Sequence, residues 1–256
     1  LVGSEMCIRD RFYTTLSVRG DVWKNFDYSS YDVIIYFAAI VHHPEITDEV
    51  LYNRVNAEIP YEMAKLAVEQ GVKKFIYIST MAVVGLAPRF GNINPINRST
   101  PLYPNTPYGR SKLRGERMLS QIDRLCIQLV RLPNVYGQNC PGTFFHRIEQ
   151  LSSLKILPIY KNDYKFSLIS VENVAVALNR LLLINESGVF CPQDTPILSI
   201  VERIKKLAEA NGIRQKQIKW MWPIVYLANK ILPKKLTDNL YGGYYIDPIE
   251  YPVLTD

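Results

Sequence analysis

Tyr108 and Lys112 are the residues whose types and spacing most directly indicate chemistry in this sequence. Residues four apart on a helix lie one above the other on a single face, so the ammonium could stabilise a phenolate. A phenolate is a base that removes a proton from a sugar or alcohol hydroxyl. Because an unperturbed tyrosine has a pKa of about 10, this work near neutrality requires nearby positive charge. Thr80, at the end of an apolar run, would hold the same substrate oxygen through its hydroxyl.

The Tyr-x-x-x-Lys spacing alone is weak evidence, because about one match is expected by chance among 17 tyrosines. Tyr108 is distinguished by its context: it follows the strand-ending Ser79-Thr80 by a loop-sized interval, and Thr106-Pro107 signals a helix start. We interpret the two other matches as surface or half-buried helix pairs; they are Tyr61/Lys65 and Tyr226/Lys230.

Apolar runs alternate with helical patterns in the first half of the chain, which predicts a parallel α/β sheet with right-handed crossovers. The expected strands are 13–18, 32–38, 74–79 and 125–131, and the expected helices are 48–70 and 107–121. The continuous apolar run 32–38 is typical of a strand covered on both faces. Thr47 and Gly71 are the expected caps of the first helix. Pro60 lies inside that helix, so the carbonyl of Asn56 should lose its helical partner and the helix should kink.

Beyond residue 137 the alternation loosens, which indicates a smaller lobe that returns one strand to the main sheet. Helices are expected near 143–152, 171–185, 198–211 and 223–232, and strands near 166–170 and 188–191. Trp220 and Trp222, with apolar neighbours at helical spacing, are typical of a lobe's core. Attachment of 219–235 to a membrane surface is the alternative interpretation of the same segment.

Composition excludes several classes of protein. The chain has 256 residues, 48% of them hydrophobic, and no apolar run approaches the roughly 18 residues of a membrane span. Four cysteines without paired spacing argue against a zinc site or a disulfide framework, and they fit a reducing cytoplasm. The net charge of +6 is made of scattered residues, so we expect phosphate-bearing ligands and no nucleic acid.

Several segments, in the right order, resemble the extended short-chain dehydrogenase/reductase family of NAD-dependent sugar-nucleotide epimerases and dehydratases. The resemblance covers about residues 18–245. The segments that carry it, besides Tyr108-x-x-x-Lys112, are Gly20-Asp21-Val22, Phe37-Ala38-Ala39, Val55-Asn56-Ala57, residues 78–85 around Thr80, and residues 131–137 around Pro133 and Asn134.

The resemblance implies a Rossmann-like parallel α/β sheet with a smaller C-terminal substrate lobe, and NAD or NADP as cofactor. It implies that Tyr108 is the acid/base, that Lys112 tunes it and holds the nicotinamide ribose, and that Thr80 positions the substrate oxygen. The cofactor-binding residues that it implies are Asp21, Val22, Phe37, Ala38, Ala39, Asn56, Tyr108, Lys112 and Pro133, and the substrate-binding residues are Thr80 and Asn134.

The dinucleotide fingerprint Gly-x-Gly-x-x-Gly, which normally follows the first strand of such a sheet, does not occur in this sequence. Residues 1–11 resemble translated adaptor sequence. We therefore expect a non-native leader over 1–11, a partial NAD(P)-binding Rossmann domain lacking its first βαβ unit over 12–140, and a substrate-binding lobe, cut short at its C-terminus, over 141–256.

Departures from the family pattern narrow the expected activity. Dehydratases carry Asp-Glu directly after the active-site Thr, but Met81-Ala82 stand here and neither moves a proton. Phe166 stands where many 4-epimerases carry an Arg to the nucleotide phosphates, and Lys165 is a candidate replacement. Residues 38–42, 133–137 and 142–144 look closer to a subgroup that acts on UDP-N-acetylhexosamines and their 4-keto derivatives and makes surface polysaccharide precursors. We assign no catalytic role to His42 or His43.

These features predict a nucleotide-sugar 4-epimerase, similar to UDP-glucose and UDP-GlcNAc 4-epimerases, that works by transient oxidation at C4. A 4-keto-sugar nucleotide reductase would use the same three residues and stays open, as does a catalytically silent nucleotide-sensing relative. The resemblance further implies a cytoplasmic homodimer that associates through the helices 48–70 and 107–121, with a UDP-sugar as substrate.

Overall fold

The computed structural model describes residues 12–41, 48–137, 143–159, 164–231 and 234–255. Its central feature is a parallel four-stranded sheet in the order β1-β2-β4-β8, which confirms the predicted sheet class. These strands are β1 (Val33–Tyr36), β2 (Lys74–Thr80), β4 (Cys126–Leu132) and β8 (Gly188–Phe190). The return of β8 to the main sheet was also expected.

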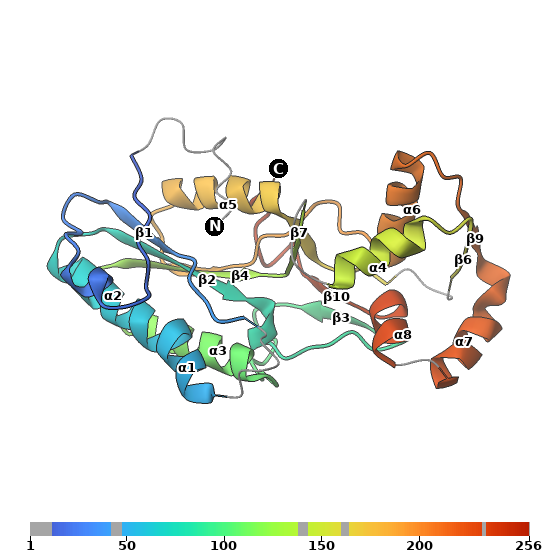
Figure 1. The fold of residues 1–256 in the computed structure, drawn as a ribbon, viewed down its shortest axis with the longest axis horizontal. Helices are drawn as coiled ribbons and strands as arrows, with labels where there is room; N and C mark the ends of the chain where they lie inside the picture. The colour runs from blue at the N-terminus through green and yellow to red at the C-terminus, as the bar shows by residue number, and fades with distance from the viewer. Residues whose placement is uncertain (1–11, 42–47, 138–142, 160–163, 232–233, 256) are drawn as a thin grey trace.

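Helices cover both faces of this sheet (Figure 1). On one face lie α1 (Glu49–Asn53), α2 (Ile59–Glu69) and α3 (Pro107–Leu119), and on the other lies α5 (Val171–Leu183). Successive residues of β2 point to opposite faces, because side chains alternate along a strand. Phe75 therefore packs with the cluster beneath α2 and α3, while Ile76 packs with the cluster beneath α5.

The predicted kink at Pro60 takes the form of a π-helical turn, η3 (Arg54–Glu58), between α1 and α2. Pro60 has no N–H to offer the carbonyl of Asn56, and the hydroxyl of Tyr77 on β2 donates to that carbonyl instead. A Cβ at Gly115 of α3 would lie 2.5 Å from the same carbonyl oxygen, so only glycine allows the two helices to approach this closely. The kink thus ties the helical layer to the sheet.

Most of the second half of the chain, together with β3 from the first half, forms a smaller body to one side of the sheet (Figure 1). Two-stranded parallel pairs link it together, and several were not expected from the sequence. Its strands are β3 (Ile93–Ile96) with β10 (Gly243–Ile246), β5 (Asn134–Tyr136) with β7 (Leu168–Ser170), and β6 (Ile156–Pro158) with β9 (Lys216–Ile218). Its helices are α4 (Thr143–Ser152), α6 (Ile200–Ala210), α7 (Trp222–Ile231) and α8 (Lys234–Tyr241). Short 3-10 turns are η2 (Val22–Asn25), η4 (Met81–Val83) and η5 (Lys219–Met221).

Three expectations differ from the structure. Residues 13–18 were expected as a strand but form no regular element, since no described strand pairs with them. The first helix is capped by Asp48, whose side chain accepts from the N–H of Val50; the predicted cap Thr47 lies outside the described residues. Trp220 and Trp222 were expected in a lobe core, yet their side chains are 75% and 37% exposed.

Candidate active site

The first turn of α3 lies against the carboxyl end of β2, and this contact brings two of the predicted residues together. The hydroxyl of Thr106 accepts a hydrogen bond from the N–H of Gly109 at 3.0 Å, and Pro107 opens the helix, as predicted. Thr80 ends β2 and caps η4, accepting from the N–H of Ala82 at 3.2 Å. A hydrogen bond joins the side chains of Thr80 and Tyr108. The structure therefore places phenol and hydroxyl side by side.

Two glycines make this approach possible. A Cβ at Gly109 would lie 2.7 Å from the carbonyl oxygen of Ala82, directly after Thr80. Gly85 has a φ of +73°, and a Cβ there would lie 1.9 Å from the carbonyl oxygen of Tyr103. Larger residues at either position would push the α3 start away from the end of β2.

Lys112 lies one helical turn below Tyr108, with a side chain only 1% exposed. Its ammonium donates to the carbonyl of Ile78 at 2.8 Å and lies 4.5 Å from the centre of the Tyr77 ring. Burial lowers the pKa of Lys112 to about 7, and the negative charge of Glu116 opposes this change. Lys112 on α3 thus contacts β2 at Ile78, two residues before Thr80, and can exist in both protonation states near neutral pH.

The electrostatics of Tyr108 differ from the sequence expectation. Burial raises the pKa of its phenol above the ordinary value, and the hydrogen bond with Thr80 only partly offsets this. The ammonium of Lys112 is directed to a backbone carbonyl. The side chains around Tyr108 therefore keep the phenol protonated, and a base role requires additional positive charge beside it.

A buried ion pair that was not predicted supports these residues from below. Glu116, the next residue on the Tyr108–Lys112 face of α3, accepts from Arg131 of β4 at 3.0, 3.2 and 2.6 Å. Ser79 donates to the same carboxylate at 2.5 Å. Glu116 follows Lys112 by four residues, and this spacing alone indicated that the two share a helix face. Its pairing with Arg131 depends on the strand register that places Ser79 opposite Arg131. The pair fixes α3 against β2 and β4 beneath the reacting groups.

Asn56 was predicted beside the cofactor, and its buried side chain makes three hydrogen bonds within the protein. Its amide nitrogen donates to the carbonyl of Ile40 at 3.0 Å and to the hydroxyl of Ser111 at 2.9 Å. Its amide oxygen accepts from the N–H of Ile40 at 3.0 Å. Ser111 in turn donates to the carbonyl of Tyr108 at 2.9 Å. Asn56 therefore connects the loop after β1 to the helix that carries the phenol.

The other predicted residues fall into two places. The segment Phe37–Ala39 follows β1, and Pro133 and Asn134 follow β4, so both segments lie at the carboxyl ends of the strands that flank Thr80. Pro133 is buried, whereas Phe37 and Asn134 are exposed. Asp21 and Val22 lie elsewhere: their turn η2 packs against α2, and the exposed carboxylate of Asp21 pairs with Lys24 at 2.9 Å (Figure 1).

The region expected to contact nucleotide phosphates offers no arginine at position 166. Phe166 is buried and its ring centre lies 4.6 Å from that of Tyr244, while Lys165 is exposed and lies over the ring of Tyr245. His42 and His43 lie outside the described residues. Within the described ranges, no group of three His, Cys, Asp or Glu side chains could hold a metal ion.

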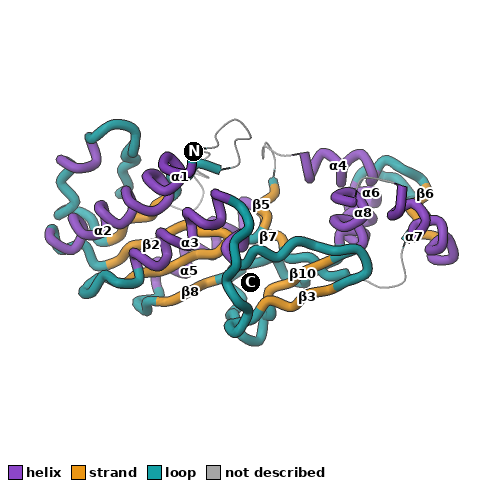
Figure 2. Tube along the Cα trace, turned by 90° about the horizontal axis from the view of Figure 1, so that it is seen from below, coloured by secondary structure: helices purple, strands orange, loops and turns teal. Residues whose placement is uncertain are grey.

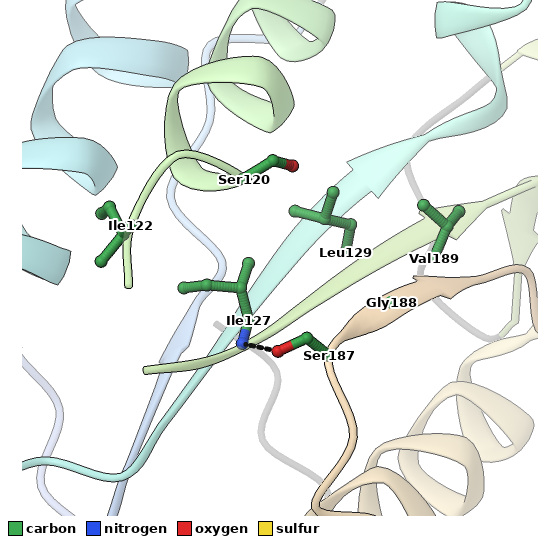
Figure 3. A pocket seen from close by; sticks show the side chains of 7 residues that line it. All are labelled: Ser120, Ile122, Ile127, Leu129, Ser187, Gly188 and Val189. Carbon is green, nitrogen blue, oxygen red and sulfur yellow. Dashed lines mark hydrogen bonds between the residues drawn. The ribbon is translucent and has the colours of Figure 1, made fainter. Parts of the chain in front are cut away.

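A cavity of about 250 Å³ lies far from this chemistry (Figure 3). It is bounded by the end of α3 and the start of β4 and β8, including Ser120, Ile127 and Gly188. Because parallel strands share their direction, this is the end of the sheet opposite to Thr80 and Tyr108. The cavity therefore does not belong to the candidate active site.

The chain is similar in sequence to known epimerases. The chain is 26% identical over 231 residues to a UDP-glucose 4-epimerase of Vibrio cholerae, an alignment that covers 84% of this chain and 68% of that protein. It is 29% identical over 135 residues to UDP-arabinose 4-epimerase 1 of Arabidopsis thaliana, covering 51% of this chain and only 31% of that protein.

A solved structure shares the fold. The UDP-glucuronic acid 4-epimerase of Bacillus cereus, in complex with NAD, superposes with a TM-score of 0.60 at 21% identity, covering 88% of this chain and 68% of that one. Residues 7–189 match the family model described as the NAD dependent epimerase/dehydratase family. Since this match extends over more than half of the 256 residues, the chain belongs to that family of NAD-dependent enzymes.

Proposed function

We propose that this chain carries the reacting groups of an NAD(P)-dependent nucleotide-sugar 4-epimerase that acts on UDP-glucose or UDP-GlcNAc. The observation that carries the proposal is the hydrogen bond between Thr80 and Tyr108, with buried Lys112 one turn away on α3. Relatives named as UDP-sugar 4-epimerases support the substrate class. The family match supports the cofactor.

Each residue has a defined task in this proposal. Thr80 positions the 4-oxygen of the sugar by donating a hydrogen bond from its hydroxyl, and Tyr108 removes or returns the proton of that same oxygen. Lys112 holds the ribose of the cofactor through its ammonium. NAD, when bound, supplies the hydride acceptor and the positive ring that lowers the pKa of the phenol.

The residues at the strand ends fit the nicotinamide half of such a cofactor. Ala38 and Ala39 have short side chains at the end of β1, and Pro133 follows β4, so no long side chain of these positions fills the edge beside Thr80. Asn56 keeps the Ala39 segment in place through its two bonds to Ile40. The epimerase proposal is preferred over dehydration because Met81 and Ala82 have no proton to transfer.

The test compares two tyrosine-to-phenylalanine variants of the full-length protein in an assay with UDP-glucose, UDP-GlcNAc and added NAD. Tyr108→Phe should reduce turnover by about 100- to 10,000-fold while the fold is retained. Tyr61→Phe is the matched control, because Tyr61 is also followed by a lysine four residues later, but on α2, with exposed Lys65 lying 5.1 Å from the ring centre. Equal turnover of Tyr108→Phe and wild type would refute the assignment.

The same assay separates the alternatives. Consumption of NADPH with a UDP-4-keto-sugar, without epimerisation of either UDP-sugar, would assign the chain as a reductase. Binding of UDP-sugar without conversion under all conditions would assign it as a silent relative.

We further propose a cytoplasmic homodimer that associates through α1, α2 and α3. The outer faces of these helices are joined within the chain by ion pairs, such as Arg114 with Glu58 at 3.3 Å, while Val50 and Leu51 of α1 stay exposed. Leu51→Glu should convert a dimer into a monomer in sedimentation equilibrium; an unchanged mass would reject this interface.

A further inference from the structure

An exposed apolar stripe runs along η5 and α7. Its members are 75%, 54%, 58% and 76% exposed, and they are Trp220, Ile224, Leu227 and Ile231. The spacing of three and four residues places Ile224, Leu227 and Ile231 on one face of α7, and Trp220 precedes them in η5. Single exposed apolar residues are ordinary on protein surfaces, but an aligned set of large ones marks a contact surface.

The opposite face of α7 is already packed against the protein. Val225 is 3% exposed and belongs to a cluster with Tyr164 and Tyr241. The ring of Tyr226 lies 6.4 Å from that of Phe90. The helix is therefore seated on the lobe by one face, and its stripe is the outward face that this contact leaves uncovered.

The basic residues are scattered along the whole chain, but the excess of basic over acidic residues falls in the same segment. Residues 210–237 contain no Asp or Glu, and their six basic residues are Arg214, Lys216, Lys219, Lys230, Lys234 and Lys235. The net charge of the whole chain is +6, so the rest of the chain contains equal numbers of acidic and basic residues. Arg214, Lys216 and Lys230 are exposed in the structure. The segment that carries the apolar stripe is therefore basic, with no acidic residue between positions 210 and 237.

We propose that η5 and α7 lie on an anionic phospholipid bilayer, with the stripe immersed at the boundary between headgroups and acyl chains. Helices that lie in a membrane surface combine an apolar face that includes Trp with Lys and Arg around it. Tryptophan favours this boundary, because its ring is apolar and its N–H is polar. Anionic headgroups complement the basic residues of 210–237.

The proposed mode is attachment to the surface, in agreement with the helix lengths. Among the residues that the structure describes, no helix has the length and hydropathy to cross a bilayer. Figures 1 and 2 both show α7 at the end of the molecule opposite to β1 and α2.

Vesicle flotation of the full chain tests the proposal, with phosphatidylcholine vesicles and with vesicles of phosphatidylcholine and phosphatidylglycerol at 7:3. Binding is expected to the mixed vesicles and to be at least tenfold weaker on phosphatidylcholine alone. Tryptophan emission should shift to the blue on binding, because Trp220 and Trp222 are exposed and would leave water. Trp23 is 1% exposed, so its emission should not change. Absence of binding to the mixed vesicles would overturn the proposal.

Two variants identify the surface. The stripe variant carries Trp220→Ser, Ile224→Gln, Leu227→Gln and Ile231→Gln, and it should lose binding at least tenfold while its circular dichroism stays unchanged. The matched control replaces four exposed apolar residues elsewhere, by Phe12→Ser, Leu154→Gln, Leu183→Gln and Ile249→Gln. The control should bind as wild type does. Equal binding of the stripe variant and the control would overturn the proposal.

A third variant tests the role of charge. Arg214→Gln, Lys216→Gln and Lys230→Gln together should weaken binding to the mixed vesicles about 100-fold, since each basic residue at an anionic surface contributes about fivefold. Higher salt should weaken binding by wild type in the same direction. A different outcome would show that the stripe joins two copies of the chain: wild type does not bind the vesicles, and the stripe variant has a lower mass than wild type in sedimentation equilibrium. The membrane proposal would then fail.

Discussion

Removing Glu116 while keeping Arg131 should destabilise the protein strongly. The two side chains are 3% and 8% exposed, and they share three contacts between 2.6 and 3.2 Å. Burial alone would lower the pKa of Arg131, but the hydrogen bonds and charge of Glu116 raise it above its ordinary value. Glu116→Leu therefore leaves a charged guanidinium without a partner in the core, which costs about 3–5 kcal/mol.

A double-mutant cycle in thermal unfolding measures this interaction. For a chain of this length about 2 °C is lost per kcal/mol, so Glu116→Leu should lower the melting temperature by about 6–10 °C. The double variant Glu116→Leu/Arg131→Met removes both charges and should recover most of the loss. The hydroxyl of Ser79 loses its acceptor in both variants, so its contribution cancels in the comparison. The reasoning would be refuted if the double variant lost as much in melting temperature as Glu116→Leu and Arg131→Met lose together.

Three further predictions follow from the same elements. Gly109→Ala should cost about 1–3 kcal/mol and lower turnover, because the added methyl meets the backbone of η4; calorimetry and the epimerase assay check this. Burial lowers the pKa of Lys112 from 10.5 to about 7. Between pH 7 and 10.5 the unfolded state therefore binds more protons than the folded state, so the free energy of unfolding should rise with pH across this window. Lys112→Met should abolish that slope in urea titrations from pH 6 to 10. Lys74→Met should cost about 1–3 kcal/mol, because Lys74 donates at 3.1 and 2.7 Å to two carbonyls at the end of α5, whereas the exposed neighbour change Lys73→Met should cost less than about 0.5 kcal/mol.

Local sequence patterns predicted the positions of Thr80, Tyr108 and Lys112 within their elements. Tyr108 and Lys112 share a helix face by periodicity, and Thr80 was placed by the end of an apolar run. The kink at Pro60 followed from its missing N–H alone. The pairing of Glu116 with Arg131 could not be predicted, because it depends on strand register, which no local pattern specifies.

Where burial depends on long-range packing, the sequence was ambiguous. The pattern of α7 is amphipathic whichever face is outward, so it did not separate a core helix from a surface one, and Trp220 proved to be exposed. Residues 13–18 have a strand-like composition, but a strand requires a neighbour to bond with, and among the described residues they pair with no strand. The expected domain boundaries stay a prediction.

The close approaches at Gly85 and Gly109 have a consequence for how this protein family diversifies. Thr80, Tyr108 and Lys112 all belong to one strand–loop–helix stretch, residues 74–119, whose parts are held together by backbone contacts within that stretch. The lobe meets this stretch through β3, which pairs with β10, but the approaches at Gly85 and Gly109 are made to Tyr103 and Ala82, outside that pair. Under the proposed function, mutations that reshape the lobe for a different sugar can therefore accumulate while the stretch that carries Thr80, Tyr108 and Lys112 keeps its internal geometry, so ligand preference and reaction chemistry would evolve as separable traits.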